Sequence, residues 1–324
     1  MAPLLEIKDL TTSITSAKNK LTIVGGISIT LEAGETLGVV GESGCGKSVT
    51  SLSVMRLLDK KVEISGNVLF EGADLLALSE KEMQKLRGNQ IAMIFQEPMT
   101  SLNPLHTIGK QIAEPLIRHQ GLSKREAKER ATQLLRQVGI PRPAEICSEY
   151  PHQLSGGMRQ RVMIAMAMAC NPKVLIADEP TTALDVTIQA QILELMKKVK
   201  REQGTAILLI THDLGVVAEM CDRVIVMYAG QIVEEADVRS LFRDPKHPYT
   251  VGLMKSMPDV KSEQERLESI PGAVPLLHEM PGGCRFAPRC SKAMDICHRQ
   301  APELHAAGDG HRCRCWLYAE GEKK

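Results

Sequence analysis

The sequence predicts an α/β protein with a largely parallel sheet. Several apolar runs show no alternation of apolar and polar residues, as expected for strands that are covered on both faces. Helical patterns separate these runs, and such alternation of strands and helices favours a parallel sheet. With 324 residues, the chain is long enough for about two domains.

The expected elements follow from these patterns in chain order. Strands are expected at Leu4–Ile7, Ile27–Leu31, Thr36–Val40, Val68–Phe70, Ile91–Ile94, Val174–Ala177, Ala206–Ile210, Val224–Tyr228 and Gln231–Val233. Helices are expected at Gly46–Leu58, Lys124–Val138, Gly156–Cys170 and Val186–Arg201. Residues 97–170 are mostly helical in pattern, which indicates a helical subdomain at about 97–165 inserted into the sheet.

Composition excludes several classes of function. The formal net charge is +1, so there is no bulk electrostatic reason to expect nucleic acid or an anionic membrane surface as a partner. The first ten residues lack the basic start of a signal peptide. The longest apolar run, Val162–Cys170, is far shorter than the ~18 residues of a membrane span. We therefore expect a cytosolic protein, or one that is attached to a membrane through partners.

A phosphate-binding loop follows the strand expected at 36–40. Residues 41–48 read G-E-S-G-C-G-K-S and match G-x-x-x-x-G-K-[ST] between a strand and a helix. Backbone N–H groups of such a loop surround phosphate oxygens, while Lys47 neutralises β/γ-phosphate charge and Ser48 binds Mg²⁺. The expected nucleotide-binding residues are Gly41, Glu42, Ser43, Gly44, Cys45, Gly46, Lys47, Ser48 and Val49.

An acidic pair ends the strand expected at 174–177. Ligands of open α/β sheets bind at the carboxyl ends of the strands. Asp178 is therefore the candidate Mg²⁺ ligand, and Glu179 is the candidate general base that activates the attacking water.

A second anion-binding site is expected at the start of the helix at 156–170. Ser155 is its candidate N-cap, followed by Gly156 and Gly157, and an exposed helix N-terminus attracts anions. One nucleotide does not need two such sites, but a head-to-tail dimer does. Gln96 and His212, which each follow a strand, are candidates to contact the metal, the water or the γ-phosphate.

These motifs, in this order, resemble the ATP-binding cassette (ABC) ATPases over residues 4–240. The resemblance adds a D-loop at Ala183–Asp185 and implies that Asp185 belongs to the nucleotide site, with Mg²⁺ held by Ser48, Gln96 and Asp178. It implies catalytic roles for Glu179, His212 and Gln96. The fold implied for 1–240 is a P-loop NTPase core of ABC type, with the helical subdomain and an antiparallel β subdomain.

Finer features resemble the ATP-binding subunits of dipeptide and oligopeptide importers. They are the Q-loop extension Phe95–Pro104, Met158 in the signature motif at 154–158, and the segment His247–Thr250. The resemblance implies two membrane permease subunits, an extracytoplasmic substrate-binding protein and a second ABC ATPase subunit, identical or homologous, at the cytoplasmic face of the inner membrane. The helical subdomain would receive the permeases. In place of an aromatic residue that stacks on adenine, this chain offers only Ile14.

Other readings remain open at the level of sequence. Related importers carry nickel, glutathione or other small solutes, and the sequence of this chain does not indicate which solute is transported. A soluble ABC ATPase acting on ribosomes or DNA usually has two cassettes or long coiled-coil insertions, which this chain lacks. A subunit that binds ATP only for assembly is disfavoured, because Glu179, Gln96 and His212 are all present.

The extension at 241–324 is rich in proline and glycine and holds five of the nine cysteines. In a reducing compartment such crowding favours a metal site over disulfides. The spacing of Cys284, Cys290, Cys297 and Cys315 is not that of zinc ribbons, and iron–sulfur spacings vary more widely. The importer resemblance implies a [4Fe-4S] cluster on these four thiols. Zinc or free thiols are the alternatives, and Cys313, His298 and His311 are competing candidates for the fourth ligand.

Overall fold

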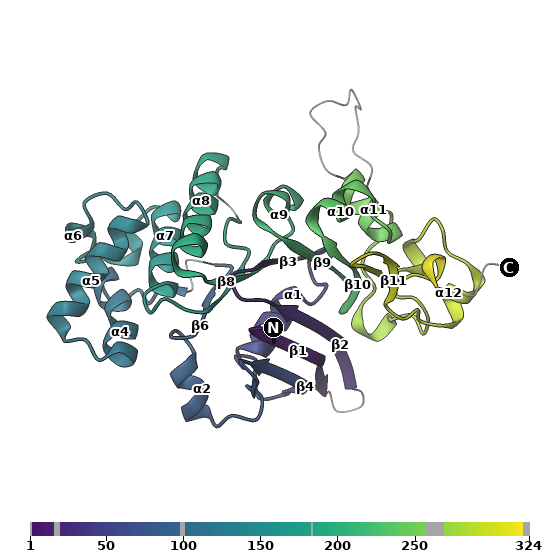
Figure 1. Cartoon of the computed structure of the whole chain (residues 1–324), viewed down its shortest axis with the longest axis horizontal. Coiled ribbons are helices and arrows are strands. Elements are labelled where there is room, and N and C mark those ends of the chain that lie inside the picture. The colour runs from purple at the N-terminus through teal and green to yellow at the C-terminus, as the bar shows by residue number, and fades with distance from the viewer. Residues whose placement is uncertain (1, 16–19, 98–100, 183, 257–268, 320–324) are drawn as a thin grey trace. The chain divides into compact units, whose positions relative to one another are not determined.

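A computed structural model describes residues 2–15, 20–97, 101–182, 184–256 and 269–319. The chain divides into two compact units. The first comprises Met1–Leu4, Leu31–Glu35 and Ala77–Ile210, and the second comprises Leu5–Thr30, Thr36–Leu76 and Thr211–Lys324. Both contain strands and helices, which confirms the predicted α/β class (Figure 1).

The first unit contains three parallel strands, β6 (Ile91–Ile94), β7 (Val174–Asp178) and β8 (Ala206–Ile210). Ala177 pairs with Ile94 of β6 and with Leu209 of β8. All residues of β7 and β8 are buried, which explains why their sequences are continuous apolar runs rather than alternating ones.

Helices make up the rest of the first unit. Residues 108–167 fold into the cluster of helices α4–α7 in Figure 1. The helices of this unit are α2 (Glu80–Leu86), α4 (Ile108–Gln120), α5 (Lys124–Gln137), α6 (Pro143–Ile146), α7 (Gly156–Ala167) and α8 (Val186–Gln203). Ser123 begins α5 with a reciprocal capping box to Glu126, which fixes where that helix starts.

The second unit holds an antiparallel sheet of strand order β2-β1-β4-β5. Its strands are β1 (Leu5–Thr15), β2 (Lys20–Leu31), β4 (Val62–Phe70) and β5 (Ala73–Asp74). A bulge interrupts the pairing of β1 with β4 between Lys8 and Thr11, where Asp9 adopts a left-handed backbone. The expected antiparallel β subdomain is therefore present.

The same unit also pairs β3 (Thr36–Val40) with β9 (Arg223–Tyr228) in parallel. Strand β10 (Gln231–Asp237) runs antiparallel to β9 and to β12 (His311–Cys313), which pairs with β11 (His305–Gly308). The helices here are α1 (Lys47–Val54), α9 (Leu214–Met220), α10 (Val238–Arg243), α11 (Pro248–Lys255) and α12 (Asp295–Arg299). Because β12 joins β10, the C-terminal extension shares a sheet with β9 and β10.

An apolar cluster packs the extension against these strands. Tyr228 of β9 lies 4.7 Å from Tyr249 and 5.2 Å from Phe286, measured between ring centroids, and all three side chains are buried. Aromatic pairs at such distances stabilise packing beyond the area they bury. The extension therefore contributes its own large side chains to the core of this unit.

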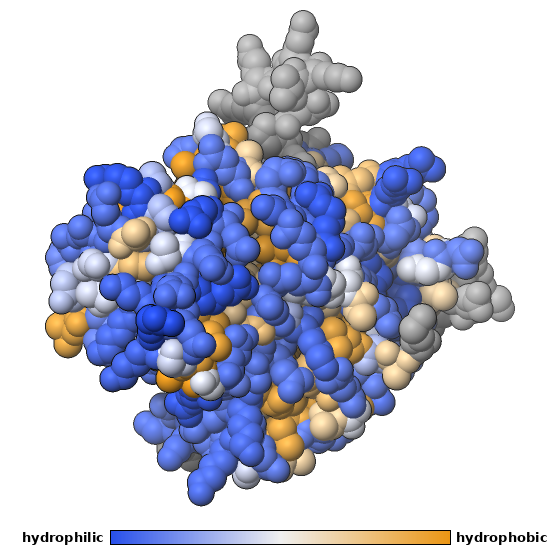
Figure 2. Space-filling view, turned by 60° about the vertical axis from the view of Figure 1, so that its left-hand side comes forward, coloured by the Kyte–Doolittle hydropathy of each residue, from blue (hydrophilic) through white to orange (hydrophobic). Residues whose placement is uncertain are grey.

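The face drawn in Figure 2 is mostly hydrophilic, with limited hydrophobic areas. Among the described residues, no helix combines the length and the apolar character that a membrane crossing requires.

Candidate functional site

The phosphate-binding loop lies in the second unit, between β3 and α1. Gly41, Gly44 and Gly46 all have positive φ, at 152°, 78° and 101°. A Cβ on Gly41 would lie 2.2 Å from the Met227 carbonyl oxygen, so only glycine fits there. Ser43 and Gly44 are exposed at the tip of the loop, whereas Cys45 is buried beneath it.

Lys47 connects the two ends of this loop. Its ammonium group donates hydrogen bonds to the carbonyl oxygens of Gly41 (2.7 Å) and Glu42 (3.0 Å). The side chain is buried, so its position is fixed by the loop rather than by solvent. Gly46 caps α1, and Ser48 and Val49 lie in the first turn of that helix, where backbone N–H groups favour phosphate.

The first unit brings together two predicted catalytic residues. Glu179 directly follows β7, and its carboxylate accepts a hydrogen bond from Gln96 Nε2 (3.0 Å). The same oxygen accepts a second bond from the Thr182 hydroxyl (2.9 Å). The backbone of Glu179 is left-handed, with φ of 47°, an uncommon conformation that collects at functional sites. Asp178, at the end of β7, is buried.

The signature helix α7 has the expected N-cap. The Ser155 hydroxyl accepts the Met158 N–H at 3.3 Å. Ser155 and Gly156 are exposed, and a Cβ on Gly156 would meet open space. A Cβ on Gly157 would approach Ile188 of α8 to 3.1 Å, so this glycine permits close packing of the two helices. The helix N-terminus is thus accessible to an anion.

The other residues predicted for the nucleotide site are a helix cap, two exposed side chains and some positions outside the described ranges. Asp185 is the N-cap of α8 and accepts the Ile188 N–H at 2.9 Å. His212 is exposed in the turn between β8 and α9, and Ile14 is exposed on β1. Ala183 of the D-loop and residues 98–100 of the Q-loop extension lie outside the described residues.

Two residues of the C-terminal extension, which no motif assigned to the nucleotide site, hold the phosphate-binding loop. The Glu42 N–H donates to the Tyr249 hydroxyl (2.8 Å), and the Arg289 guanidinium donates to both Glu42 carboxylate oxygens (2.7 and 3.0 Å). Tyr249 and Arg289 are 207 and 247 positions from Glu42. No local pattern in a single sequence reveals contacts over such separations.

The four cysteines that the importer resemblance implies as cluster ligands line one small cavity. Cys284, Cys290, Cys297 and Cys315 surround a space of about 10 Å³, roughly the size of a water molecule. Cys313 is fully buried and hydrogen-bonded to Cys315, and this bond lowers the pKa of Cys315 to about 7. Burial raises the pKa of Cys284 to about 11.

The two histidines that compete as the fourth ligand, His298 and His311, do not line this cavity. His311 Nε2 hydrogen-bonds Glu234 (2.7 Å), and His298 is exposed on α12. Cysteine thiolates are the donors that iron–sulfur clusters use, but a space of about 10 Å³ is too small to hold a cluster of eight atoms. As they stand, no three His, Cys, Asp or Glu side chains in the described ranges are grouped so that they could hold a metal ion.

Comparisons with known proteins agree with these motifs. Residues 24–182 match the family described as "ABC transporter", and residues 233–297 match "Oligopeptide/dipeptide transporter, C-terminal region". The oligopeptide transport ATP-binding protein AppD of Bacillus subtilis is 54% identical over 99% of this chain and 98% of its own length. The dipeptide transport ATP-binding protein DppD of Haemophilus influenzae is 52% identical, over 98% and 97%.

A solved structure supports the fold. The ATP-binding cassette MJ0796, in a dimeric post-hydrolysis state bound to ADP and Pi, is 30% identical, with a TM-score of 0.66 over 72% of this chain and 99% of that one. The identified motifs, the two matched regions and the full-length relatives agree. The chain belongs to the ABC transporter family, in its group of oligopeptide and dipeptide transport ATP-binding proteins, and it is an ATPase.

Proposed function

We propose that this chain couples ATP hydrolysis to the import of dipeptides or oligopeptides. The observation that carries the proposal is the presence of both matched regions on one chain: a cassette and the C-terminal region specific to peptide transporters. The full-length likeness to an oligopeptide and a dipeptide transport protein supports it. The chain then works at the cytoplasmic face of the membrane, attached through its partners.

The roles of the site residues follow from their chemistry. Glu179 acts as the general base, and Gln96, bonded to its carboxylate, positions it and the attacking water. His212 contacts the γ-phosphate. Ser48, Asp178 and Gln96 would hold Mg²⁺, which neutralises phosphate charge when bound.

A second cassette, identical or homologous, completes the site in this proposal. The exposed N-terminus of α7 offers Ser155, Gly156 and Gly157 to a nucleotide that the partner's phosphate-binding loop holds. The dimeric state of MJ0796 supports this arrangement.

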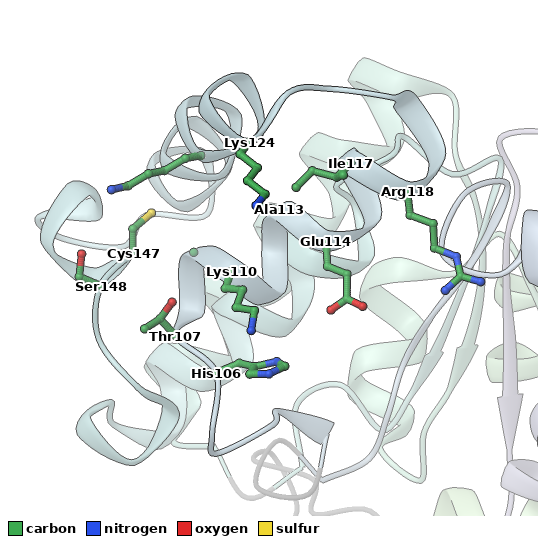
Figure 3. A pocket seen from close by; sticks show the side chains of 12 residues that line it. His106, Thr107, Lys110, Ala113, Glu114, Ile117, Arg118, Lys124, Cys147 and Ser148 are labelled. Atoms are coloured by element: carbon green, nitrogen blue, oxygen red, sulfur yellow. The ribbon is translucent and has the colours of Figure 1, made fainter.

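The helical subdomain offers a surface for the permeases. A pocket of about 820 Å³ is open beside α4, and Figure 3 shows Lys110, Glu114 and Arg118 of that helix around it. Lys124 and Lys128 of α5 also line it, so four of the five Lys, Arg, Asp and Glu side chains around the pocket are cationic. We expect an acidic cytoplasmic segment of a permease to bind there.

Uptake by a reconstituted complex tests the proposal. The chain is co-purified with its permeases and placed in proteoliposomes, and uptake of labelled di- and oligopeptides is measured with the binding protein and ATP. Peptide uptake that is lost in a Glu179→Gln complex is expected. Uptake of nickel or glutathione instead of peptides, ATPase activity stimulated only by ribosomes or DNA, or no hydrolysis with the permeases would contradict it.

We further propose that Cys284, Cys290, Cys297 and Cys315 hold a [4Fe-4S] cluster with a structural role, which cross-links a segment poor in regular structure. The four thiols line one space, which supports this assignment, and that space would have to widen to admit a cluster. Protein purified without oxygen should be brown, contain iron and acid-labile sulfide, and absorb near the blue edge of the visible range. Stoichiometric zinc in a colourless protein, or no bound metal, would overturn it.

A further inference from the structure

The C-terminal extension contacts the phosphate-binding loop through one buried arginine. The Arg289 side chain is 5% exposed, and its guanidinium forms a two-pronged ion pair with Glu42, the second residue of the loop motif. Such bidentate pairs have defined geometry as well as strength. They place both partners in fixed orientations.

Arg289 is itself held in place by the extension. Its Nε donates to the Pro271 carbonyl (2.9 Å), and its Nη2 lies 3.4 Å from the Ile270 carbonyl oxygen. The Tyr228 hydroxyl accepts a further bond of 3.4 Å. The guanidinium is therefore fixed before it meets Glu42, and the loss of side-chain entropy on pairing is small.

The loop residue is fixed at a second point. The Tyr249 hydroxyl accepts the backbone N–H of Glu42, and Tyr249 is fully buried in the aromatic cluster with Tyr228 and Phe286. The extension thus binds both the backbone N–H and the carboxylate of Glu42. Glu42 lies directly after Gly41, where the loop leaves β3.

Charge gives this contact a consequence for nucleotide binding. A carboxylate within a loop that surrounds a polyanion repels the phosphates unless a cation neutralises it. Arg289 supplies that cation, and the adjacent Glu42 carboxylate raises the pKa of the arginine further above its ordinary value. Paired with this guanidinium, the Glu42 carboxylate adds no net negative charge to the loop.

We propose that Arg289 is a positioning residue for ATP binding: it neutralises Glu42 and fixes the first turn of the phosphate-binding loop. The C-terminal extension is then part of the nucleotide site and not only an appendage of the cassette. This inference rests on ATP binding alone and is independent of the transported solute.

Nucleotide affinity of the full-length chain tests the proposal. The Kd for ATP should rise about tenfold in Arg289→Gln, equivalent to about 1.4 kcal/mol. In the double variant Glu42→Gln/Arg289→Gln the uncompensated carboxylate is gone, so the Kd should return to within about threefold of wild type. The kcat at saturating ATP should change little, because Arg289 does not touch the reacting atoms.

The control is Arg312→Gln. Arg312 lies on the same extension and pairs with Glu235 of β10, and this ion pair does not involve the phosphate-binding loop. This variant should leave the Kd for ATP unchanged even if the unfolding temperature falls. The proposal would be overturned if Arg289→Gln and Arg312→Gln had equal Kd values for ATP. It would also be overturned if the double variant Glu42→Gln/Arg289→Gln bound ATP no more tightly than Arg289→Gln. If Arg289→Gln does not fold, Arg289→Lys replaces it: lysine keeps the positive charge beside Glu42, so its Kd for ATP should stay within about threefold of wild type. A tenfold rise in the Kd of Arg289→Lys would overturn the proposal.

Discussion

At the scale of single residues, the backbone conformation of Glu179 and its hydrogen bonds bear directly on its proposed role as general base. Its left-handed backbone and its bonds from Gln96 and Thr182 fix the carboxylate after β7. A side chain held by two donors keeps one orientation without its substrate, which is what a general base requires.

Replacing this carboxylate by an amide separates binding from hydrolysis. Glu179→Gln should reduce ATPase activity by at least about 100-fold, because an amide cannot take the proton of the attacking water. ATP should still bind, and the cassettes should remain associated as a closed dimer. Steady-state phosphate release, nucleotide binding and size-exclusion chromatography with ATP and Mg²⁺ measure the three effects.

The matched control is Glu194→Gln on α8, an exposed residue whose carboxylate pairs with Lys197 on the same helix. It should hydrolyse ATP at the wild-type rate. Retained turnover in Glu179→Gln would remove Glu179 from the role of base, since no rearrangement gives an amide that function.

Gly156 permits a test of the signature helix that does not disturb the fold. Its Cβ position is open, and an acidic residue in the first turn of α7 is compatible with the helix dipole. Gly156→Asp should therefore fold normally and bind ATP at its own phosphate-binding loop. It should fail to dimerise and hydrolyse ATP, because the new carboxylate repels the partner's phosphates.

Circular dichroism, nucleotide binding and sedimentation with ATP separate these effects. Gly156→Ala is the control, since it fills the same open space without charge and should retain dimerisation. Normal ATP-dependent dimerisation of Gly156→Asp would show that this helix does not meet a partner's nucleotide.

At the scale of elements, burial decided what could be predicted from the sequence. The continuous apolar runs at 36–40, 91–94 and 206–210 match β3, β6 and β8 to the residue, because strands covered on both faces leave no alternation to interrupt them. The run at 4–7 gave only the start of β1, since the bulge at Asp9 breaks the period.

The site shows the same division. The motifs predicted the residues at strand ends, because each motif is contiguous. The contacts of Tyr249 and Arg289 with Glu42 join distant segments, and β12 joins β10 through a segment without apolar periodicity. Such pairings depend on tertiary packing, which local patterns do not record.

The cysteine cavity gives a prediction about this extension. Cys315 lines the cavity and Cys313 does not, so Cys315→Ser should lose the bound metal whereas Cys313→Ser should retain it. A serine hydroxyl is a poor ligand for soft metals compared with a thiolate. Metal analysis of anaerobically purified variants measures the difference. Loss of metal from Cys313→Ser with retention in Cys315→Ser would reverse the assignment of the fourth ligand.

At the scale of the whole molecule, one buried carboxylate joins the extension to the cassette strands. Glu234 of β10 is fully buried and accepts hydrogen bonds from the backbone N–H groups of Lys246 (2.6 Å) and His247 (2.8 Å). His311 of β12 binds the same side chain. Two segments of the extension, at 246–247 and in β12, thus depend on a single residue, in the same unit as the phosphate-binding loop.

Glu234→Gln should lower the free energy of unfolding by about 2–3 kcal/mol, because it leaves His311 and two backbone donors with weaker partners in a buried site. Trp316, the only tryptophan, lies in the extension, so its fluorescence during urea unfolding reports on this part directly. Asp309→Asn, in the exposed turn between β11 and β12, is the control and should unfold at the wild-type urea concentration. If Glu234→Gln unfolded there as well, the attachment of the extension would rest on its apolar cluster and not on this carboxylate.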